Sequence, residues 1–369
     1  MNGSGSFRIG HRTRRHMHRA LIVFIASLVA VAVACGTSPR AAPESARPRP
    51  VVGPSLDAPM AQKLDQVIER KVQQTGVPGV IVGVWSPTGS YVHGFGVADK
   101  ATHAPMSPDM LIRIGSETKT FTVTGLLQLV DQGRVALDDP ISKYVAGVPQ
   151  GDRITLRELA RMQSGLFNYS NDEQFDRRLL AAPFRPWTPA ELLAVSFSHP
   201  LVFPPGQGWQ YSNTNTVLLG LVVEQVSGQP LPDYLQKNVF GPLGLTRTSF
   251  PDTNAFPEPH PQGYTTESPG GPEAIATDWD PSWAWAAGAM ISDLKDLRTW
   301  APALATGRLL KPTTQAERLQ TVTPPGFSPQ AAYGLGLFEV AGWIGHNGSL
   351  PGYHSRCTCP RSGRPWWCC

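Results

Sequence analysis

Residues 111–130, LIRIGSETKTFTVTGLLQLV, join a short β-type run directly to a helical pattern. The run LIRIG (111–115) is typical of a strand, and apolar residues then recur at the i, i+3, i+4, i+7 spacing of a helix core face over 123–130. Ser116 stands at the junction, where a helix N-terminus offers unpaired N–H groups and the positive end of its dipole. The stretch predicts a strand-to-helix turn that carries a hydroxyl, followed by a helix that Gly133 can end.

Lys119 follows Ser116 by three residues, so both side chains lie on one face of the predicted helix. An amine with a lowered pKa is one way to activate a hydroxyl as a nucleophile. The spacing alone is weak evidence, because Ser292 and Lys295 repeat it and a helix N-cap explains Ser292. A capping role is also an alternative for Ser116.

The surrounding chain has strand signals at both ends and helix signals in the middle. Residues 79–97 hold two β-rich runs around a Pro/Gly turn, and strand character returns at 333–340 and 344–349. Between them, capping boxes start helices at Thr155 and Thr188. These patterns predict an α/β fold in which the N- and C-terminal segments form one sheet around a mostly helical insertion.

Tyr211-Ser212-Asn213 precedes another predicted helix, and it supplies two useful polar groups. A phenol close to a lysine can pass a proton between nucleophile and leaving group, and the Asn213 amide can orient a substrate carbonyl. Residues 169–171 repeat the same three letters within a polar run, which we interpret as a loop without a catalytic role.

His346-Asn347-Gly348-Ser349 is the third element, on the late strand. Gly348 allows a substrate backbone to come close, and outward N–H groups of the strand can pair with it. A structural histidine is the alternative for His346.

The three elements, in this order, resemble the serine β-lactamase-like family, which includes D-alanyl-D-alanine carboxypeptidases, class C β-lactamases and related esterases. The likeness covers about residues 60–355 and includes the flanking runs TKTFTVTGLLQLVDQGRVALDDPISKYV, ITLRELARMQSGL, FPPGQGWQYSNTNTVLLGLVVEQVSGQPL and GPLGLTRTSF. The resemblance implies a β-lactamase-like sandwich, an antiparallel sheet flanked by helices with a helical insertion at about 120–285. It implies no metal and no organic cofactor.

The resemblance also assigns roles. It implies Ser116 as the acylated nucleophile, Lys119 as its proton partner, Tyr211 as general base and acid, Asn213 as the group that holds the substrate amide, and His346 in place of a lysine common in relatives, with Asn347, Gly348 and Ser349 on the substrate-binding strand. The backbone N–H groups of Ser116 and Ser349 would hold the oxyanion. Whether Lys119 or Tyr211 takes the first proton stays open.

Charge and cysteine content exclude other classes. Residues 1–34 carry five arginines and no acid, so the rest of the chain has 27 basic and 28 acidic residues and no footprint for nucleic acid. The body between Cys35 and Cys357 has no cysteine, which excludes a disulfide framework or a thiolate metal site there. We expect a small acyl substrate: an ester, a peptidoglycan stem peptide or a β-lactam.

Residues 1–34 have the three parts of an export signal. Two interpretations fit Cys35: the acylated first residue of a bacterial lipoprotein, because Ala32-Val33-Ala34-Cys35 resembles a lipobox, or an incidental thiol after ordinary cleavage. The proline-rich segment 35–57 suits a tether. We therefore expect an exported protein, lipid-anchored on the outer face of the bacterial cytoplasmic membrane or else secreted.

Two departures from the family bear on function. No Arg or Lys stands between Arg318 and Arg356, which weakens recognition of a substrate carboxylate and favours esterase chemistry over carboxypeptidase chemistry. We rank a true β-lactamase lower, because the features that deacylate penicillins are not evident.

The second departure is the segment 356–369, whose Cys, Trp and Arg content changes abruptly and suggests a frameshift near Ser355. The hydrolase domain would then be 58–355, without the two strands and the helix that follow in relatives. This predicts an unprotected edge at the His346 strand, poor stability and low activity. The alternative function is a truncated, catalytically impaired penicillin-fold binding protein.

Overall fold

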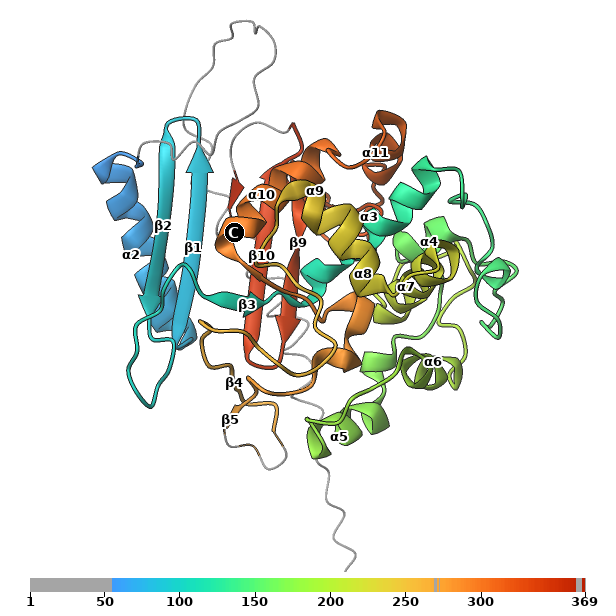
Figure 1. Ribbon diagram of the computed structural model, residues 1–369, viewed down its shortest axis with the longest axis horizontal. Coiled ribbons are helices and arrows are strands. Elements are labelled where there is room, and N and C mark those ends of the chain that lie inside the picture. Colours follow the sequence, from blue (N-terminus) through green and yellow to red (C-terminus); the bar gives the residue numbers. More distant parts are fainter. Residues whose placement is uncertain (1–54, 269–270, 272, 363–366, 369) are drawn as a thin grey trace, which may run out of the picture. The chain divides into compact units, whose positions relative to one another are not determined.

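The structure is a computed structural model that describes residues 55–268, 271, 273–362 and 367–368, all of which belong to one compact unit. Its main sheet has seven strands in the order β2-β1-β11-β10-β9-β8-β7, and every neighbouring pair is antiparallel. The strands are β1 (Gly79–Ser86), β2 (Gly89–Gly96), β7 (Ala331–Tyr333), β8 (Phe338–Val340), β9 (Trp343–Leu350), β10 (Tyr353–Pro360) and β11 (Trp367–Cys368). N- and C-terminal segments thus share one sheet, as the sequence predicts (Figure 1).

The hairpin β1–β2 is confirmed, in register from Gly79 opposite Gly96 to Ser86 opposite Gly89. Helix α2 (Ala58–Thr75) lies along this hairpin and buries Ile68 in a small cluster with Leu56 and Tyr91. In Figure 1 the blue and cyan elements of this hairpin and helix stand apart from the green and yellow helices.

The predicted strand-to-helix junction is confirmed. Strand β3 (Leu111–Arg113) leads through a 3₁₀ turn, Gly115–Glu117, into helix α3 (Thr118–Asp131). From Thr118 to Leu127 this helix is buried on every face, as a helix at the centre of a fold must be. The position of the junction is therefore fixed by packing in the core.

Helices are the main regular elements of the chain between β3 and the C-terminal strands. They are α4 (Leu156–Ala160), α5 (Glu173–Ala181), α6 (Pro189–Phe197), α7 (Asn213–Ser227), α8 (Leu231–Leu235), α9 (Gly241–Leu243), α10 (Leu294–Thr306) and α11 (Pro312–Arg318). Both predicted capping boxes are formed, at Thr155 and Thr188. Two small sheets, β3 with β6 (Ile291–Asp293) and β4 (Tyr264–Thr265) with β5 (Ala274–Ile275), complete the fold.

Two local predictions are wrong. The expected strand at 333–340 is two strands, β7 and β8, because the chain turns between them and Gly334 N donates to Leu337 O at 2.9 Å. Ser292 does not cap α10: it lies inside β6, and the Asp293 side chain accepts from Asp296 N in its place.

The prediction that the strands after the His346 strand are missing and leave it unprotected is also wrong, on the side of β9 where those strands pair. Strand β10 pairs with β9 along its whole length, from Tyr353 opposite Leu350 to Pro360 opposite Trp343. Strand β11 then pairs with both β10 and β1. The segment after Ser355 forms a strand because its burial alternates: Cys357 and Cys359 are buried, whereas Arg356 and Thr358 are partly exposed.

Two strands therefore follow β9, contrary to the expectation that they are missing, and the described residues contain no helix after α11. The frameshift and the poor stability stay predictions, but the second loses the exposed edge that motivated it.

The export signal, Cys35 and most of the predicted tether lie outside the described residues. Within the described part of the chain, no helix has the length and apolar content that crossing a membrane requires.

Candidate active site

Ser116 and Lys119 meet at the start of α3. Lys119 Nζ donates to Ser116 Oγ at 2.9 Å and to the backbone oxygen of Ala287 at 2.7 Å. The lysine is fully buried, and this burial holds the pKa of its amine well below the ordinary value, because the charged form loses its hydration. Ser116 itself is partly exposed, so a buried amine stands directly behind an accessible hydroxyl.

Tyr211 lies on the other side of the amine, just before α7. Lys119 Nζ is 4.8 Å from the centre of the Tyr211 ring. Burial raises the pKa of the phenol, and the neighbouring Ser116 hydroxyl acts in the opposite direction. The Tyr211 hydroxyl is buried and has no hydrogen-bond partner within the described residues. A protonated phenol therefore faces the nucleophile with its proton available.

Asn213 opens α7 and is held by a turn that follows α4. Its backbone N donates to Asn168 Oδ1 at 3.0 Å, and its Nδ2 donates to Ser170 Oγ at 3.1 Å. Its Oδ1 is buried and accepts no hydrogen bond from the described residues. That oxygen is the group left to receive a substrate N–H. The run at 169–171, interpreted as a loop, is a 3₁₀ turn that supports Asn213.

His346 is buried within β9, and both of its ring nitrogens have partners inside the protein. Nδ1 lies 2.6 Å from the backbone oxygen of Asn347, and Nε2 lies 3.3 Å from the Tyr333 hydroxyl. Burial, followed by the charge of Lys119, lowers the pKa of His346 to about 3. The ring is therefore neutral, donating from Nδ1 and accepting at Nε2. It lies 6.0 Å from the Tyr211 ring, between centroids.

Strand β9 passes directly over the nucleophile turn. A Cβ on Gly115 would lie 2.6 Å from Ser349 N, and one on Gly348 would lie 1.9 Å from Ile114 O, so both positions need glycine. Gly115 also has a positive φ of 50°. This close approach puts the backbone N of Ser349 beside the turn that carries Ser116.

One edge of β9 is open at this point. Strand β8 pairs with it only at Trp343, Ile344 and Gly345, and no other strand of the described chain pairs with that side from His346 onward. An extended substrate could use the free edge at His346–Ser349. Ser349 is exposed there, and Asn347 is partly exposed.

The structure thus brings together the predicted residues from all three elements. Four further groups contact these residues and were not predicted from the sequence: Tyr333, Asn168, Ser170 and the Ala287 carbonyl. Their contacts join segments that are far apart in the chain. Only Ser170 lay in a motif that the sequence showed, the repeated run at 169–171, which we interpreted as a loop without a catalytic role.

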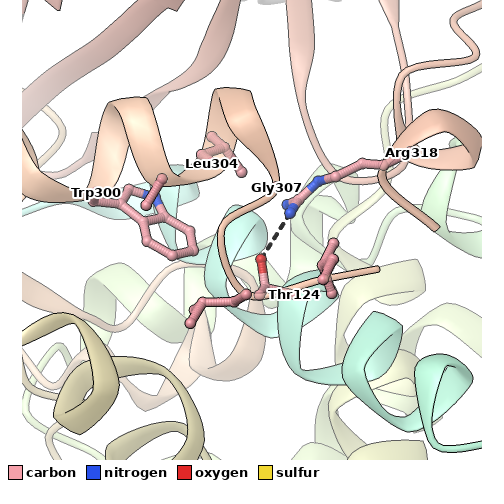
Figure 2. A pocket seen from close by; sticks show the side chains of 8 residues that line it. Thr124, Trp300, Leu304, Gly307 and Arg318 are labelled. Atoms are coloured by element: carbon pink, nitrogen blue, oxygen red, sulfur yellow. Dashed lines mark hydrogen bonds between the residues drawn. The ribbon is translucent and has the colours of Figure 1, made fainter. Parts of the chain in front are cut away.

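Helix α3 is anchored from behind by Arg318 of α11. The guanidinium donates to Thr124 Oγ1 at 2.8 Å (Figure 2) and also to Thr120 O at 2.9 Å. The enclosed space beside it, which Trp300 and Leu304 also line, is too small for a water molecule. It is a packing feature of the core and not a ligand site. The described residues also contain no group of three His, Cys, Asp or Glu side chains that could hold a metal ion.

A comparison with known proteins identifies the family. A family model described as Beta-lactamase matches residues 64–362. The chain belongs to the β-lactamase family. Its predicted family membership and fold class are therefore confirmed.

Individual relatives of this β-lactamase-family chain include amide hydrolases and penicillin-binding proteins. A D-stereospecific amidohydrolase from Streptomyces sp. is 36% identical, with a TM-score of 0.78 over 85% of this chain and 93% of that one. The D-amino acid amidase of Ochrobactrum anthropi SV3, solved with L-phenylalanine amide, is 30% identical, with a TM-score of 0.73 over 84% and 90%. PbpX of Bacillus subtilis, described as a penicillin-binding protein, is 27% identical over 81% of this chain and 72% of its own length.

Proposed function

We propose that this protein is a serine hydrolase that forms an acyl-enzyme at Ser116 and cleaves amides or esters of D-amino acids whose leaving group is uncharged. The observation that carries the proposal is the 2.9 Å contact between the fully buried Lys119 amine and the accessible Ser116 hydroxyl. A lysine kept out of water in this way is suited to act as a base.

Acylation begins with proton transfer from Ser116 to Lys119. A neutral amine has two hydrogens and one lone pair. One hydrogen bonds to Ala287 O, and the lone pair can turn toward the Ser116 hydroxyl 2.9 Å away. As Ser116 Oγ bonds to the substrate carbonyl carbon, its proton passes to Lys119 Nζ. Because its pKa is raised, the Tyr211 phenol stays protonated and cannot take the Ser116 proton first. Lys119 is therefore the group that accepts this proton.

Collapse of the tetrahedral intermediate then breaks the bond between the carbonyl carbon and the leaving nitrogen or oxygen. Tyr211 gives its proton to that atom and recovers one from Lys119. The N–H groups of Ser116 and Ser349 hold the oxyanion, and Asn213 Oδ1 receives a substrate N–H. Water later attacks the acyl ester by the same route in reverse, which releases the acid and restores Ser116.

The environment of His346 supports an uncharged leaving group. Its two nitrogens are occupied and its ring is neutral, so it offers no charge to a substrate carboxylate. The sequence has no Arg or Lys between Arg318 and Arg356, a stretch that includes the whole of β9. A carboxypeptidase needs such a cation. The amidohydrolase and amidase relatives favour the D-amino acid amide as the substrate to test first.

The test compares three substrates on one preparation: D-phenylalanine amide, a D-alanyl-D-alanine dipeptide with a free carboxylate, and a chromogenic cephalosporin. We expect turnover of the amide, with kcat/KM at least tenfold above that of the dipeptide. A preference for the dipeptide would return the assignment to carboxypeptidase. A folded protein that turns over none of them, and takes no fluorophosphonate label, would support the impaired binding protein.

We also propose that the protein is exported and held at the membrane through Cys35. Expression in a bacterial host with labelled palmitate tests this. Label that is lost in Cys35→Ser supports the anchor, and an unlabelled protein in the culture medium would instead support ordinary secretion.

A further inference from the structure

Three aromatic residues that have no part in the reaction described above lie beside Tyr211: Trp209, Phe327 and Phe338. All three are partly exposed, as is Tyr211. The Phe338 ring lies 6.4 Å from the Tyr211 ring, between centroids, and within 11° of parallel to it. The Phe327 ring lies 6.4 Å beyond Phe338, within 8° of parallel, and Trp209 meets Phe327 edge-on at 5.4 Å. We call these three residues the aromatic surface.

The aromatic surface is assembled from three separate segments. Trp209 precedes α7, Phe338 opens β8, and Phe327 lies between α11 and β7 on a turn in which its N donates to Pro324 O at 3.1 Å. Beneath them the fully buried Tyr333 packs edge-on against Phe338 at 4.6 Å and against Trp209 at 5.7 Å. Ring pairs at such separations are favourable, so the surface is formed before any substrate binds.

The proposed reaction relates the aromatic surface to the bond that breaks. Asn213 Oδ1 receives an N–H of the acyl part of the substrate, whereas Tyr211 gives its proton to the leaving atom. The group attached to that atom therefore lies on the Tyr211 side of the carbonyl. Phe338 and then Phe327 continue from the Tyr211 ring on that side.

The free edge of β9 leads to the same rings. Ser349, whose N–H would hold the oxyanion, and His346 both belong to this edge. Strand β8 pairs with β9 no further than Gly345, which stands opposite Phe338. The Phe338 ring also lies 5.0 Å from the His346 ring, between centroids. A substrate that follows the edge from Ser349 toward His346 therefore reaches the aromatic surface.

The side chains around this surface favour a flat, uncharged group. Successive side chains of a strand point to opposite faces, so Glu339 points away from Phe338. Its carboxylate pairs with Arg361 at 2.5 Å instead. The His346 ring is neutral and both of its nitrogens are occupied. Aromatic rings pack well against another ring, either offset-stacked or edge-on, so a ring on the leaving group would complement the surface.

We propose that Trp209, Phe327 and Phe338 bind the leaving group, and that the preferred substrates are amides or esters of amines or alcohols that carry an aromatic ring. This inference rests on the proposed function and adds the identity of the leaving group to it. As the bond from the carbonyl carbon to the leaving atom breaks, the Tyr211 proton passes to that atom. The amine or alcohol then departs along these rings, and the acyl group stays on Ser116.

The experiment compares D-alanine N-benzylamide with D-alanine N-methylamide, which share an acyl group and differ in the leaving amine. The quantity measured is the ratio of their kcat/KM values, benzyl over methyl, in wild type and in each variant. This ratio does not depend on the fraction of folded, active protein. Comparing it between proteins also cancels the intrinsic reactivity of the two amides.

Phe327 is the residue to change, because it lies on a loop and not in the sheet. We expect Phe327→Ala to lower the ratio about tenfold, since a ring contact and the area it buries contribute on that order. Phe327→Leu keeps part of the apolar contact and should lower the ratio less. Phe184→Ala is the matched control: Phe184 is 62% exposed between α5 and α6, and its removal should leave the wild-type ratio unchanged.

A third substrate, D-phenylalanine N-methylamide, carries its ring on the acyl side. A variant Phe327→Ala that discriminates against this substrate, and not against the benzylamide, would overturn the inference, because the rings would then hold the acyl side chain. A benzyl-to-methyl ratio that falls no further than in Phe184→Ala would also overturn it. Both results leave the proposed function in place. A wild-type protein that turns over none of the substrates and takes no fluorophosphonate label on Ser116 would overturn the two together.

Discussion

The pairs Ser116–Lys119 and Ser292–Lys295 have the same spacing in the sequence but different structures. In the first pair the lysine is buried and donates to the serine hydroxyl at 2.9 Å. In the second pair Ser292 is buried against Thr248, with 2.9 Å between the two hydroxyl oxygens, while Lys295 is exposed.

The backbone explains the difference. Glu117, inside the first pair, is helical with φ −58° and ψ −26°, so the three-residue spacing brings both side chains to one face. Asp293, inside the second pair, is extended with φ −124° and ψ 171°, which directs Ser292 into a small sheet. A spacing rule therefore identifies a catalytic pair only where the intervening backbone is already helical.

The largest effect should come from removing the Ser116 hydroxyl, with Ser292 as the matched control. We expect Ser116→Ala to lose at least about a thousandfold in kcat on the amide, as nucleophile deletions do, because no acyl-enzyme can form. Ser292→Ala should stay within about threefold of wild type on the same assay. Comparable losses in the two variants, both folded by circular dichroism, would break the comparison.

The two lysines should separate almost as widely. Lys119→Met keeps the length and apolar packing of the buried side chain but removes the amine, and we expect a loss of about 10²–10⁴-fold in kcat, the usual contribution of a general base. Lys295→Met changes an exposed side chain and should leave kcat unchanged. Steady-state kinetics near neutral pH test both. Activity of Lys119→Met close to wild type would show that another group takes the proton.

Two glycines test the approach of β9 to the nucleophile turn. Gly115→Ala puts a Cβ at 2.6 Å from Ser349 N, so the two segments must separate. Overpacking of this kind costs about 1–3 kcal/mol, and we expect a fall in kcat as well. Gly133→Ala has a similar positive φ but open space around it, so only stability should fall, by about 1 kcal/mol. Urea unfolding and kinetics on both variants separate the two effects.

A further prediction concerns stability alone and His346, for which the sequence left a structural role as an alternative. Its pKa of about 3 in the folded protein lies below the ordinary 6.5, so between these values the unfolded chain binds a proton that the native chain does not. Stability should therefore rise with pH across this window and be lost as pH falls below about 6.5. From pH 7 to pH 5 the expected loss is about 2 kcal/mol.

His346→Asn should lose less stability than wild type over that pH step, measured by urea unfolding at both values. Equal losses in the two proteins would mean that His346 is charged in the native state, contrary to the geometry of its two nitrogens.

The comparison also shows what the sequence could predict. The β1–β2 hairpin, α3 and both capping boxes depend on neighbouring residues, and each was predicted. Strands β10 and β11 were missed because their Cys, Trp and Arg content is unlike the preceding chain, and because pairing with β9 and β1 is decided far along the sequence. The turn that divides 333–340 was missed because apolar residues continue through it, so the composition gives no sign of a break.

The candidate site follows the same rule: residues within local motifs were predicted, and residues brought in by distant contacts were not. Ser116, Tyr211, Asn213 and His346 each belong to a short motif. Tyr333 and Asn168 have none, and only the folded chain shows that they fix His346 and Asn213.

The most direct test of the central claim is the location of the acyl group during turnover. A D-phenylalanine ester, quenched with acid after milliseconds and digested, should leave a phenylalanyl group on the peptide that contains Ser116, and none on the peptide that contains Ser292. An acyl group on another residue, or hydrolysis that continues in Ser116→Ala, would contradict the account.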